Sequence, residues 1–233
     1  MEKFKRIHER ALKRKGGEKA LAAYLPKVIT AKKLKAVGDD RFLAEMSRCV
    51  FQAGFVWRVV NQKWDAFENV FFGFTPEKIV LLSPEQIEKI GTNPAIIRNM
   101  QKIVSVQKNA QFVLDVAQEH GSFAAMVCDW PAGDHIGLYK LLKQRGSRLG
   151  GATGPRSLRN LGIDTFMLST DVVLCLRNAG VEIANNPTGQ KDMHAIQQAF
   201  NTWHEESGLP YSHMSRIASC SVGENYDIEA FTH

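Results

Sequence analysis

The stretch KQRGSRLGGATGPRSLRNLGIDTFMLSTD, residues 143–171, is the most informative part of this chain. Its glycines lie between two helix-type segments, and arginines stand among them. Glycine lets a backbone approach a ligand closely, and successive N–H groups in such a turn can hold a phosphate. The stretch ends on a carboxylate, Asp171, in otherwise apolar surroundings. The pattern predicts a phosphate-binding turn followed by a helix that presents one acid.

We expect the turn to contact backbone phosphates through its N–H groups and its flanking arginines. The residues assigned to this contact are Gly146, Arg148, Gly150, Gly151, Thr153, Gly154 and Arg156. Such contacts position a nucleic-acid strand without reading its sequence. The alternative is a plain glycine-rich surface turn, which the motif taken alone also fits.

The composition is that of a globular protein with a positive excess. The 233 residues include 30 Lys and Arg against 24 Asp and Glu, a net charge of +6, which fits a polyanionic partner. The wide spacing of the four cysteines favours reduced, buried thiols in a cytoplasmic protein. We expect no signal peptide and no membrane span, because no apolar run is long enough for either.

Apolar residues recur at helical spacing, and no run alternates as a strand would, so we predict an all-α protein. Residues 1–37 hold 12 Lys and Arg against three Glu, a larger positive excess than that of the whole chain, and are predicted to form a basic helical arm, either solvated or tracking phosphates. The remaining residues, 38–233, are predicted to form one domain.

Individual helices follow from the apolar period and from proline and cap signals. A long helix is expected from about Asp40 to Asn61, and another from Asn93-Pro94 to Gly121. Thr75-Pro76 and Ser83-Pro84 predict two helix starts. Further helices are expected over 121–130, 136–145, 152–161, 164–179, 188–206 and 210–221.

Three segments in order resemble the 3-methyladenine DNA glycosylase I family, within the helix-hairpin-helix DNA glycosylase superfamily. They are DDRFLAEMSRCVFQAGFVW (39–57), IIRNMQKIVSVQKNA (96–110), and GSF (121–123) followed by LKQRG-x-x-x-x-G (142–151). The resemblance covers roughly residues 39–163. It implies a two-lobed all-α fold with a base pocket between the lobes.

The chain departs from the family pattern at its zinc site and in its pocket. The resemblance implies a zinc site made of N-terminal Cys and His residues and a C-terminal His-x-x-x-Cys. This chain has no N-terminal cysteine, and His213 and Cys220 are spaced differently, so we expect no metal. The family's N-terminal Tyr/His/Trp pocket motif is missing, and its base-contacting glutamate is replaced by Cys49.

The predicted base pocket contains Trp57, Gln52, Cys49 and Glu45. Trp57 and Gln52 belong to the QAG-x-x-W core of the resemblance, and an indole can stack a flipped base, although a tryptophan on a helix is often simply core. Glu45 lies four residues before Cys49 on the same helix face, so it could partly replace the missing acid. The alternative is an exposed surface glutamate.

FMLSTDVVLCLRNAG (166–180) resembles the superfamily segment that carries a catalytic aspartate, and Asp171 matches that aspartate. We expect Asp171 to stabilise an oxocarbenium-like sugar and to orient the attacking water. The alternative, which is compatible with catalysis, is that Ser169, Thr170 and Asp171 cap the following helix, where a carboxylate would stay ionised.

The resemblance implies a DNA glycosylase that flips a damaged, alkylated purine out of duplex DNA and hydrolyses its N-glycosidic bond without a cofactor, as a monomer. No lysine lies between Lys143 and Lys191, so no Schiff-base nucleophile is available in the hairpin and no strand cleavage is expected. Two alternatives stay open: a glycosylase-like protein that binds damaged DNA without cutting, which the altered pocket favours, and a structural helical protein.

Overall fold

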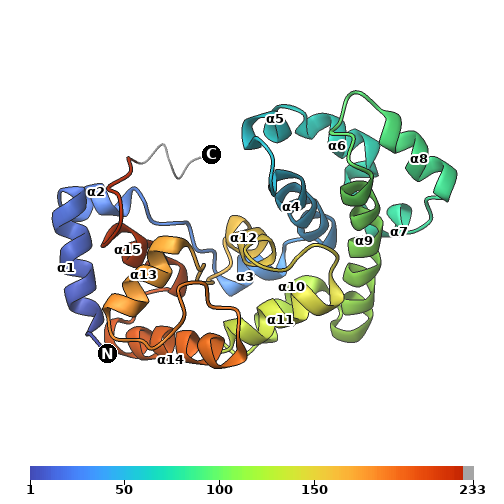
Figure 1. Cartoon of the computed structure of the whole chain (residues 1–233). Helices are drawn as coiled ribbons and strands as arrows, with labels where there is room; N and C mark the ends of the chain where they lie inside the picture. Colours follow the sequence, from blue (N-terminus) through green and yellow to red (C-terminus); the bar gives the residue numbers. More distant parts are fainter. Residues whose placement is uncertain (228–233) are drawn as a thin grey trace. The chain divides into compact units, whose positions relative to one another are not determined.

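The computed structural model describes residues 1–227, which form helices and loops with no strand among them (Figure 1). The prediction of an all-α protein is confirmed. Residues 228–233, which end the predicted domain 38–233, lie outside the described residues. No helix within 1–227 has the length and apolar character needed to cross a membrane. The chain divides into two compact units.

The first unit brings together residues 1–28, 131–137 and 162–227. Its helices are α1 (Phe4–Lys15), α2 (Glu18–Ala22), α13 (Thr170–Asn178), α14 (Gln190–Ser207) and α15 (Tyr211–Cys220). Figure 1 shows α1 beside α15, although the two helices come from opposite ends of the sequence.

Helix α1 belongs to the core of this unit. Phe4, Ile7 and Ala11 recur at three- and four-residue spacing and are fully buried. The Phe4 ring lies 5.5 Å from that of Trp203, whose indole N–H donates to the Glu2 carbonyl at 3.2 Å. The segment expected to form a basic arm, 1–37, is therefore shared between the two units. Residues 1–28 belong to the first unit, because this apolar stripe is buried against the C-terminal helices, and the second unit begins at Ile29.

The second unit comprises residues 29–130 and 138–161. Its helices are α3 (Ala31–Lys35), α4 (Asp39–Gln52), α5 (Trp57–Gln62), α6 (Trp64–Val70), the short η1 (Phe72–Phe74), α7 (Pro76–Ile79), α8 (Pro84–Thr92), α9 (Met100–His120), α10 (Phe123–Asp129), most of α11 (His135–Arg145) and α12 (Thr153–Asn160). Helix α4 is central, because it packs against both α9 and α12 (Figure 1).

The expected long helix from Asp40 to Asn61 is wrong, because the chain turns after Gln52. Gly54 has φ +68°, a left-handed conformation that glycine adopts without steric cost. The buried amine of Lys102, from α9, donates to the carbonyls of Phe51 at 3.0 Å and Ala53 at 2.7 Å. These are carbonyls that the end of α4 leaves without intrahelical partners. The turn releases α5 as a separate helix that begins at Trp57.

Other boundaries show where cap signals work and where they fail. Ser83 forms a capping box with Gln86 at the start of α8, as its sequence predicts. The helix expected from Asn93-Pro94 begins only at Met100, where the Asn99 side chain accepts from the Lys102 N–H at 3.1 Å. Likewise, the helix expected over 164–179 begins at Thr170, because Ser169 is its cap.

Candidate functional site

A half-buried carboxylate lies where α4 packs against α12. The Glu45 side chain is 13% exposed, so it is not the exposed glutamate of the alternative interpretation. Its Oε1 accepts from the amide of Asn160 at 2.7 Å, and the Cys49 thiol lies 3.6 Å from the same oxygen. The Asn160 amide also lies 3.7 Å from the Cys49 sulfur. The expected pairing of Glu45 with Cys49 on one face is thus present, with Asn160 as a third member.

Burial dominates the electrostatics of this group. It raises the pKa of Glu45, while the hydrogen bond from Asn160 and the charge of Arg48 act in the opposite direction. Burial and the neighbouring Glu45 carboxylate raise the pKa of the Cys49 thiol, so this cysteine is a neutral donor and not a thiolate nucleophile. Arg48 lies 3.9 Å from Glu45 and is itself 36% exposed, so that ion pair is worth less than about 1 kcal/mol. The Asn160 amide is the main partner of Glu45.

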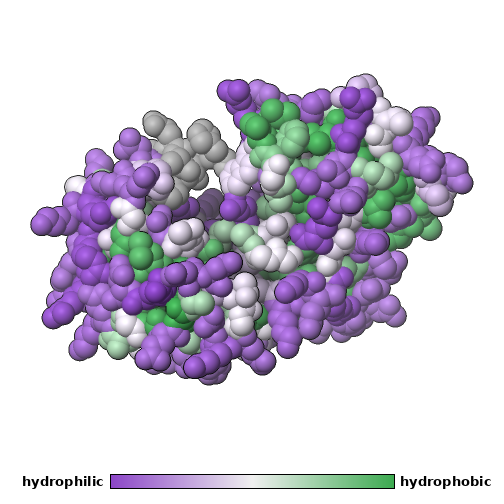
Figure 2. Space-filling model, in the orientation of Figure 1, coloured by the Kyte–Doolittle hydropathy of each residue, from purple (hydrophilic) through white to green (hydrophobic). Residues whose placement is uncertain are grey.

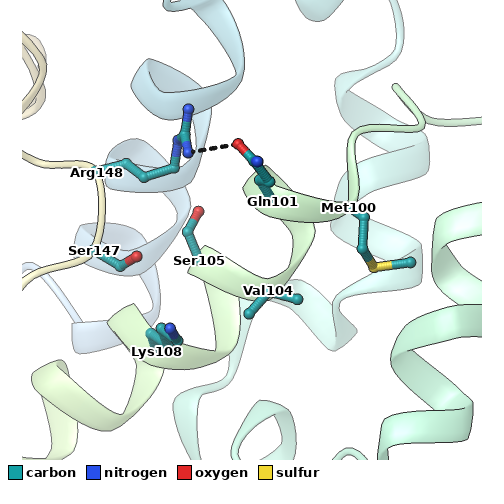
Figure 3. Close-up of a pocket in the computed structure, with 7 residues that line it drawn as sticks. All are labelled: Met100, Gln101, Val104, Ser105, Lys108, Ser147 and Arg148. Atoms are coloured by element: carbon teal, nitrogen blue, oxygen red, sulfur yellow. Dashed lines mark hydrogen bonds between the residues drawn. The ribbon is translucent and has the colours of Figure 1, made fainter.

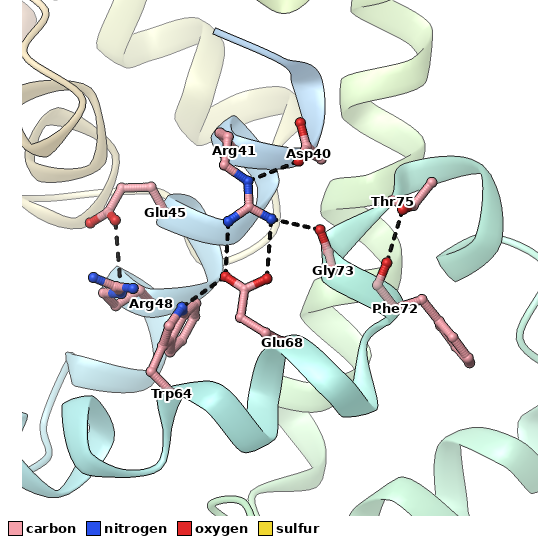
Figure 4. Close-up of polar contacts among 9 residues, drawn as sticks. All are labelled: Asp40, Arg41, Glu45, Arg48, Trp64, Glu68, Phe72, Gly73 and Thr75. Atoms are coloured by element: carbon pink, nitrogen blue, oxygen red, sulfur yellow. Dashed lines mark hydrogen bonds and ion pairs between the residues drawn. The ribbon is translucent and has the colours of Figure 1, made fainter.

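Arg48 links this group to a second polar network, drawn in Figure 4. Its guanidinium lies 4.4 Å from the Trp64 ring, and the Trp64 N–H donates to Glu68 at 3.0 Å. Glu68 also accepts two hydrogen bonds from Arg41, at 2.9 and 3.1 Å. Charges fixed in this way hold α6 against α4, which keeps the face that carries Glu45 in place.

Trp57 and Gln52, which were both predicted to lie in the base pocket, differ in exposure and in their contacts. The Trp57 ring is partly exposed and is covered on one side by the Arg156 guanidinium, 4.3 Å from the ring centre. Gln52 is 5% exposed and donates to the Asn61 side chain at 3.0 Å, which ties α4 to α5. Trp57 is therefore the aromatic surface available to a ligand, and Gln52 supports it. Arg156, predicted to contact phosphate, lies against this ring in the structure.

The glycine-rich turn connects α11 to α12, as predicted, but only part of it offers free N–H groups. The N–H groups of Gly146 and Gly154 donate to the carbonyls of Leu142 and Leu149. A Cβ at Gly154 would lie 2.5 Å from the Leu149 carbonyl oxygen, so this glycine serves close packing.

The exposed tip of the turn differs from its base. Gly151 has φ +60°, and within residues 1–227 the N–H groups of Gly150 and Gly151 donate to no protein acceptor. The Thr153 N–H is also used within the turn, because it donates to the Gly150 carbonyl at 3.3 Å. The predicted phosphate contact through N–H groups is therefore restricted to Gly150 and Gly151 at the tip. Arg148 is exposed beside it.

Two exposed apolar residues precede Trp57 and were missed by the sequence analysis. Phe55 is 45% exposed and Val56 61% exposed, in the loop between α4 and α5. Figure 2 shows apolar surface gathered around α5 and α6. Two large apolar residues placed directly after a helix-ending glycine were the available signal.

Asp171 lies in the other compact unit, in the first turn of α13. Ser169, not Asp171, caps this helix by accepting from the Val172 N–H at 3.2 Å. The carboxylate lies against the backbone of Gly223, where an added Cβ would lie 2.2 Å from its Oδ1. It accepts no hydrogen bond from any residue within 1–227.

A helix N-terminus by itself would favour the charged form of Asp171, but the surroundings of this carboxylate act against the charge. Burial raises its pKa above the ordinary value, the charge of Arg14 lowers it, and Glu224 raises it again. Arg14 is itself held by the carbonyls of Cys220 and Gly223, at 3.0 and 2.7 Å.

The residues present do not fit a zinc site. His213 is hydrogen-bonded to the Pro26 carbonyl at 2.9 Å, and Cys220 is buried at the end of α15. Within residues 1–227 no three His, Cys, Asp or Glu side chains are grouped so that they could hold a metal ion. All four cysteines are free thiols, and Cys49, Cys175 and Cys220 are buried, as the spacing predicted.

Part of this chain is similar to a known protein family. Residues 34–146 match the methyladenine glycosylase family. The matched segment includes Glu45, Cys49 and Trp57 and ends at Gly146, so the rest of the hairpin and Asp171 lie beyond it. The resemblance inferred from the sequence motifs is confirmed.

Individual methyladenine glycosylases are similar over part of their length. Over 84 residues the chain is 30% identical to DNA-3-methyladenine glycosylase 1 of Escherichia coli (strain K12), which is 36% of this chain and 44% of that protein. The chain thus aligns with less than half of this relative. A crystal structure of 3-methyladenine DNA glycosylase I matches with 24% identity over 59% of this chain and 83% of that one, at a TM-score of 0.48. A structure of 3-methyladenine DNA glycosylase I from Staphylococcus aureus matches with 26% identity over 60% of this chain and 80% of that one, at a TM-score of 0.46.

Proposed function

We propose that this protein is a DNA glycosylase that removes an alkylated purine from DNA by hydrolysis of the N-glycosidic bond. The observation that carries the proposal is the construction of α12. Its N-terminal end carries the glycine-rich turn, and its body carries Arg156 and Asn160, which contact Trp57 and the Glu45–Cys49 pair. A helix of this length spans about 12 Å, so one rigid element connects the glycine-rich turn to the Trp57 ring and the Glu45 carboxylate.

Each part of this arrangement suits one step of base removal. The N–H groups of Gly150 and Gly151 and the exposed Arg148 hold the backbone of the target strand. Phe55 and Val56 offer an apolar wedge of the kind that separates stacked base pairs. Trp57 stacks the extruded base.

Glu45 acts as the acceptor for that base, in place of the acid that Cys49 replaces. A purine nucleoside alkylated at N3 or N7 is positively charged, so a nearby carboxylate favours its binding. A base that enters this site and donates to Glu45 would take over the role of the Asn160 amide, or share the carboxylate with it. A neutral analogue would gain less from the same contact.

Asp171 is proposed as the carboxylate that assists hydrolysis. Water adds to the sugar carbon C1′ as the bond from C1′ to the purine nitrogen breaks, and the electron pair of that bond leaves with the base. The water loses a proton, which Asp171 accepts or passes to solvent. A cationic base leaves as a neutral molecule, so it needs no general acid. No lysine in the hairpin supports a Schiff base, and the enzyme is therefore proposed to be monofunctional.

The test is release of free base from methylated duplex DNA. We expect the protein to release an alkylated purine and to leave abasic sites that break only after alkaline treatment. Immediate strand cleavage would contradict the monofunctional assignment. Salt-dependent DNA binding without any base release would favour the alternative, a glycosylase-like protein that binds damaged DNA.

A further inference from the structure

A separate groove of about 330 Å³ lies along the first turns of α9 and is closed on one side by the start of the hairpin (Figure 3). Helix α9 contributes Gln101, Ser105 and Lys108, and the hairpin contributes Ser147 and Arg148. Figure 3 shows the Arg148 guanidinium directed toward Gln101, whose side-chain oxygen accepts from it at 3.1 Å. The groove lies entirely within the second unit.

The wall formed by the hairpin is held in a fixed position. The fully buried Asn109 accepts from the Ser147 N–H at 2.7 Å and donates to the Ser147 carbonyl at 3.1 Å. The next residue, Arg148, has φ +62°, which is uncommon for a residue with a side chain. Such a conformation persists only where the surroundings enforce it, and it is a reason to look for function. From this backbone position the exposed Arg148 side chain reaches Gln101.

The groove has an excess of positive charge. Lys108 and Arg148 are exposed, and neither forms an ion pair with a carboxylate of residues 1–227. Its lining contains no acid. Burial and the charge of Arg148 both lower the pKa of Lys102, which lies on the same helix, α9. An anion in the groove would relieve this repulsion between cations.

We propose that this groove binds a phosphodiester of the DNA strand held at the hairpin, so that Lys108 and Arg148 extend the phosphate contact from the turn onto α9. The inference rests on the proposed function for the identity of the strand. Ser147 and Arg148 line the groove and directly precede the exposed tip at Gly150 and Gly151, so the groove lies next to the N–H groups proposed to hold the strand. Because the Ser105 hydroxyl already donates to the Lys102 carbonyl at 2.6 Å, the main contacts to the phosphodiester are expected from Lys108 and Arg148.

The test compares Lys108→Met with Lys89→Met, which removes the same charge from an exposed position on α8 outside the groove. Binding to a short DNA duplex is measured by fluorescence anisotropy over a series of salt concentrations. Loss of one phosphate contact lowers the slope of log affinity against log salt by about 0.9. We expect this change, and weaker binding at low salt, for Lys108→Met only. Equal slopes for the two variants would overturn the proposal.

Two further measurements keep the result decisive. Gln101→Glu, at an exposed position, places a carboxylate next to Arg148 and should lower the slope as well, so the test does not depend on the folding of one variant. Inorganic phosphate is titrated at constant ionic strength as the free-anion probe. Saturable phosphate binding that Lys108→Met abolishes, with no change in the DNA slope, would assign the groove to a free anion and overturn the strand assignment.

Failure of the groove and failure of the proposed function give different results. If the unaltered protein releases base while Lys108→Met and Lys89→Met bind DNA alike, the groove inference alone is wrong. If Lys108→Met lowers the slope but the unaltered protein releases no base, the groove binds DNA and the glycosylase proposal is wrong.

Discussion

Glu45 and Asp171 are two carboxylates whose pKa values are both raised by burial, yet their surroundings differ in kind. Glu45, in the second unit, has a direct amide donor at 2.7 Å and a thiol at 3.6 Å. Asp171, in the first unit, has the charge of Arg14 nearby but accepts no hydrogen bond from residues 1–227. A carboxylate with fixed donors is suited to recognition, whereas one without donors is available to bind water. This difference supports the proposed division, with base recognition at Glu45 and hydrolysis at Asp171.

Replacement of Asp171 should have the largest effect. Asp171→Asn removes the charge that would stabilise the sugar cation and accept a proton, so base release should slow by about a hundredfold to ten-thousandfold. DNA affinity should stay nearly unchanged. Single-turnover release from methylated duplex DNA measures the rate. The matched control is Asp192→Asn, which removes another acid from the first turn of a helix in the same unit. Release at the unaltered rate by Asp171→Asn would remove this residue from the mechanism.

Glu45→Gln should reduce activity less and in a different way. Glutamine keeps an oxygen that can accept from Asn160 but loses the charge, so we expect a loss of about tenfold to a hundredfold in kcat/KM on a cationic base. A neutral substrate base should be affected less. Glu88→Gln, on the exposed face of α8, is the control for loss of a carboxylate. Unchanged excision kinetics in Glu45→Gln would discard the idea that this acid replaces the missing one.

Substitution of Trp57 tests whether the second unit binds a base through this ring. Trp57→Ala should weaken binding of the base by about 1–3 kcal/mol, because the stacking surface is lost, while Trp57→Phe should retain much of it. Affinity for free alkylated base, measured by calorimetry, gives the comparison. Equal affinity in the alanine and phenylalanine variants would mean that the ring supports the fold instead of the ligand.

The smallest expected effect is on stability. The pKa of Glu45 is raised in the folded protein, so its contribution to stability is complete below the unfolded pKa of about 4.3 and is lost as pH rises through the folded pKa. Relative to the unaltered protein, the free energy of unfolding of Glu45→Gln should therefore increase between acid and neutral pH. Urea unfolding over this range measures the difference. A constant difference in unfolding free energy would show that Asn160 fully compensates the buried charge.

The sequence alone determined the helical class, most helix positions after residue 120, and the cap at Ser83. These features depend on interactions between residues close in the chain, such as the apolar period and the side chain of a cap residue. The resemblance to the methyladenine glycosylase family likewise came from short local motifs and is confirmed over residues 34–146.

Only the tertiary structure decided the partners of those residues. Asn160 reaches Glu45, Asn109 holds Ser147, and Lys102 ends α4, in each case across many residues of sequence. It also placed residues 1–28 with the C-terminal helices. It showed that Gly154 serves close packing, while the N–H groups of Gly150 and Gly151 have no acceptor within residues 1–227. Local pattern cannot specify such pairings, because hydrogen bonds and burial between distant segments depend on how the helices pack.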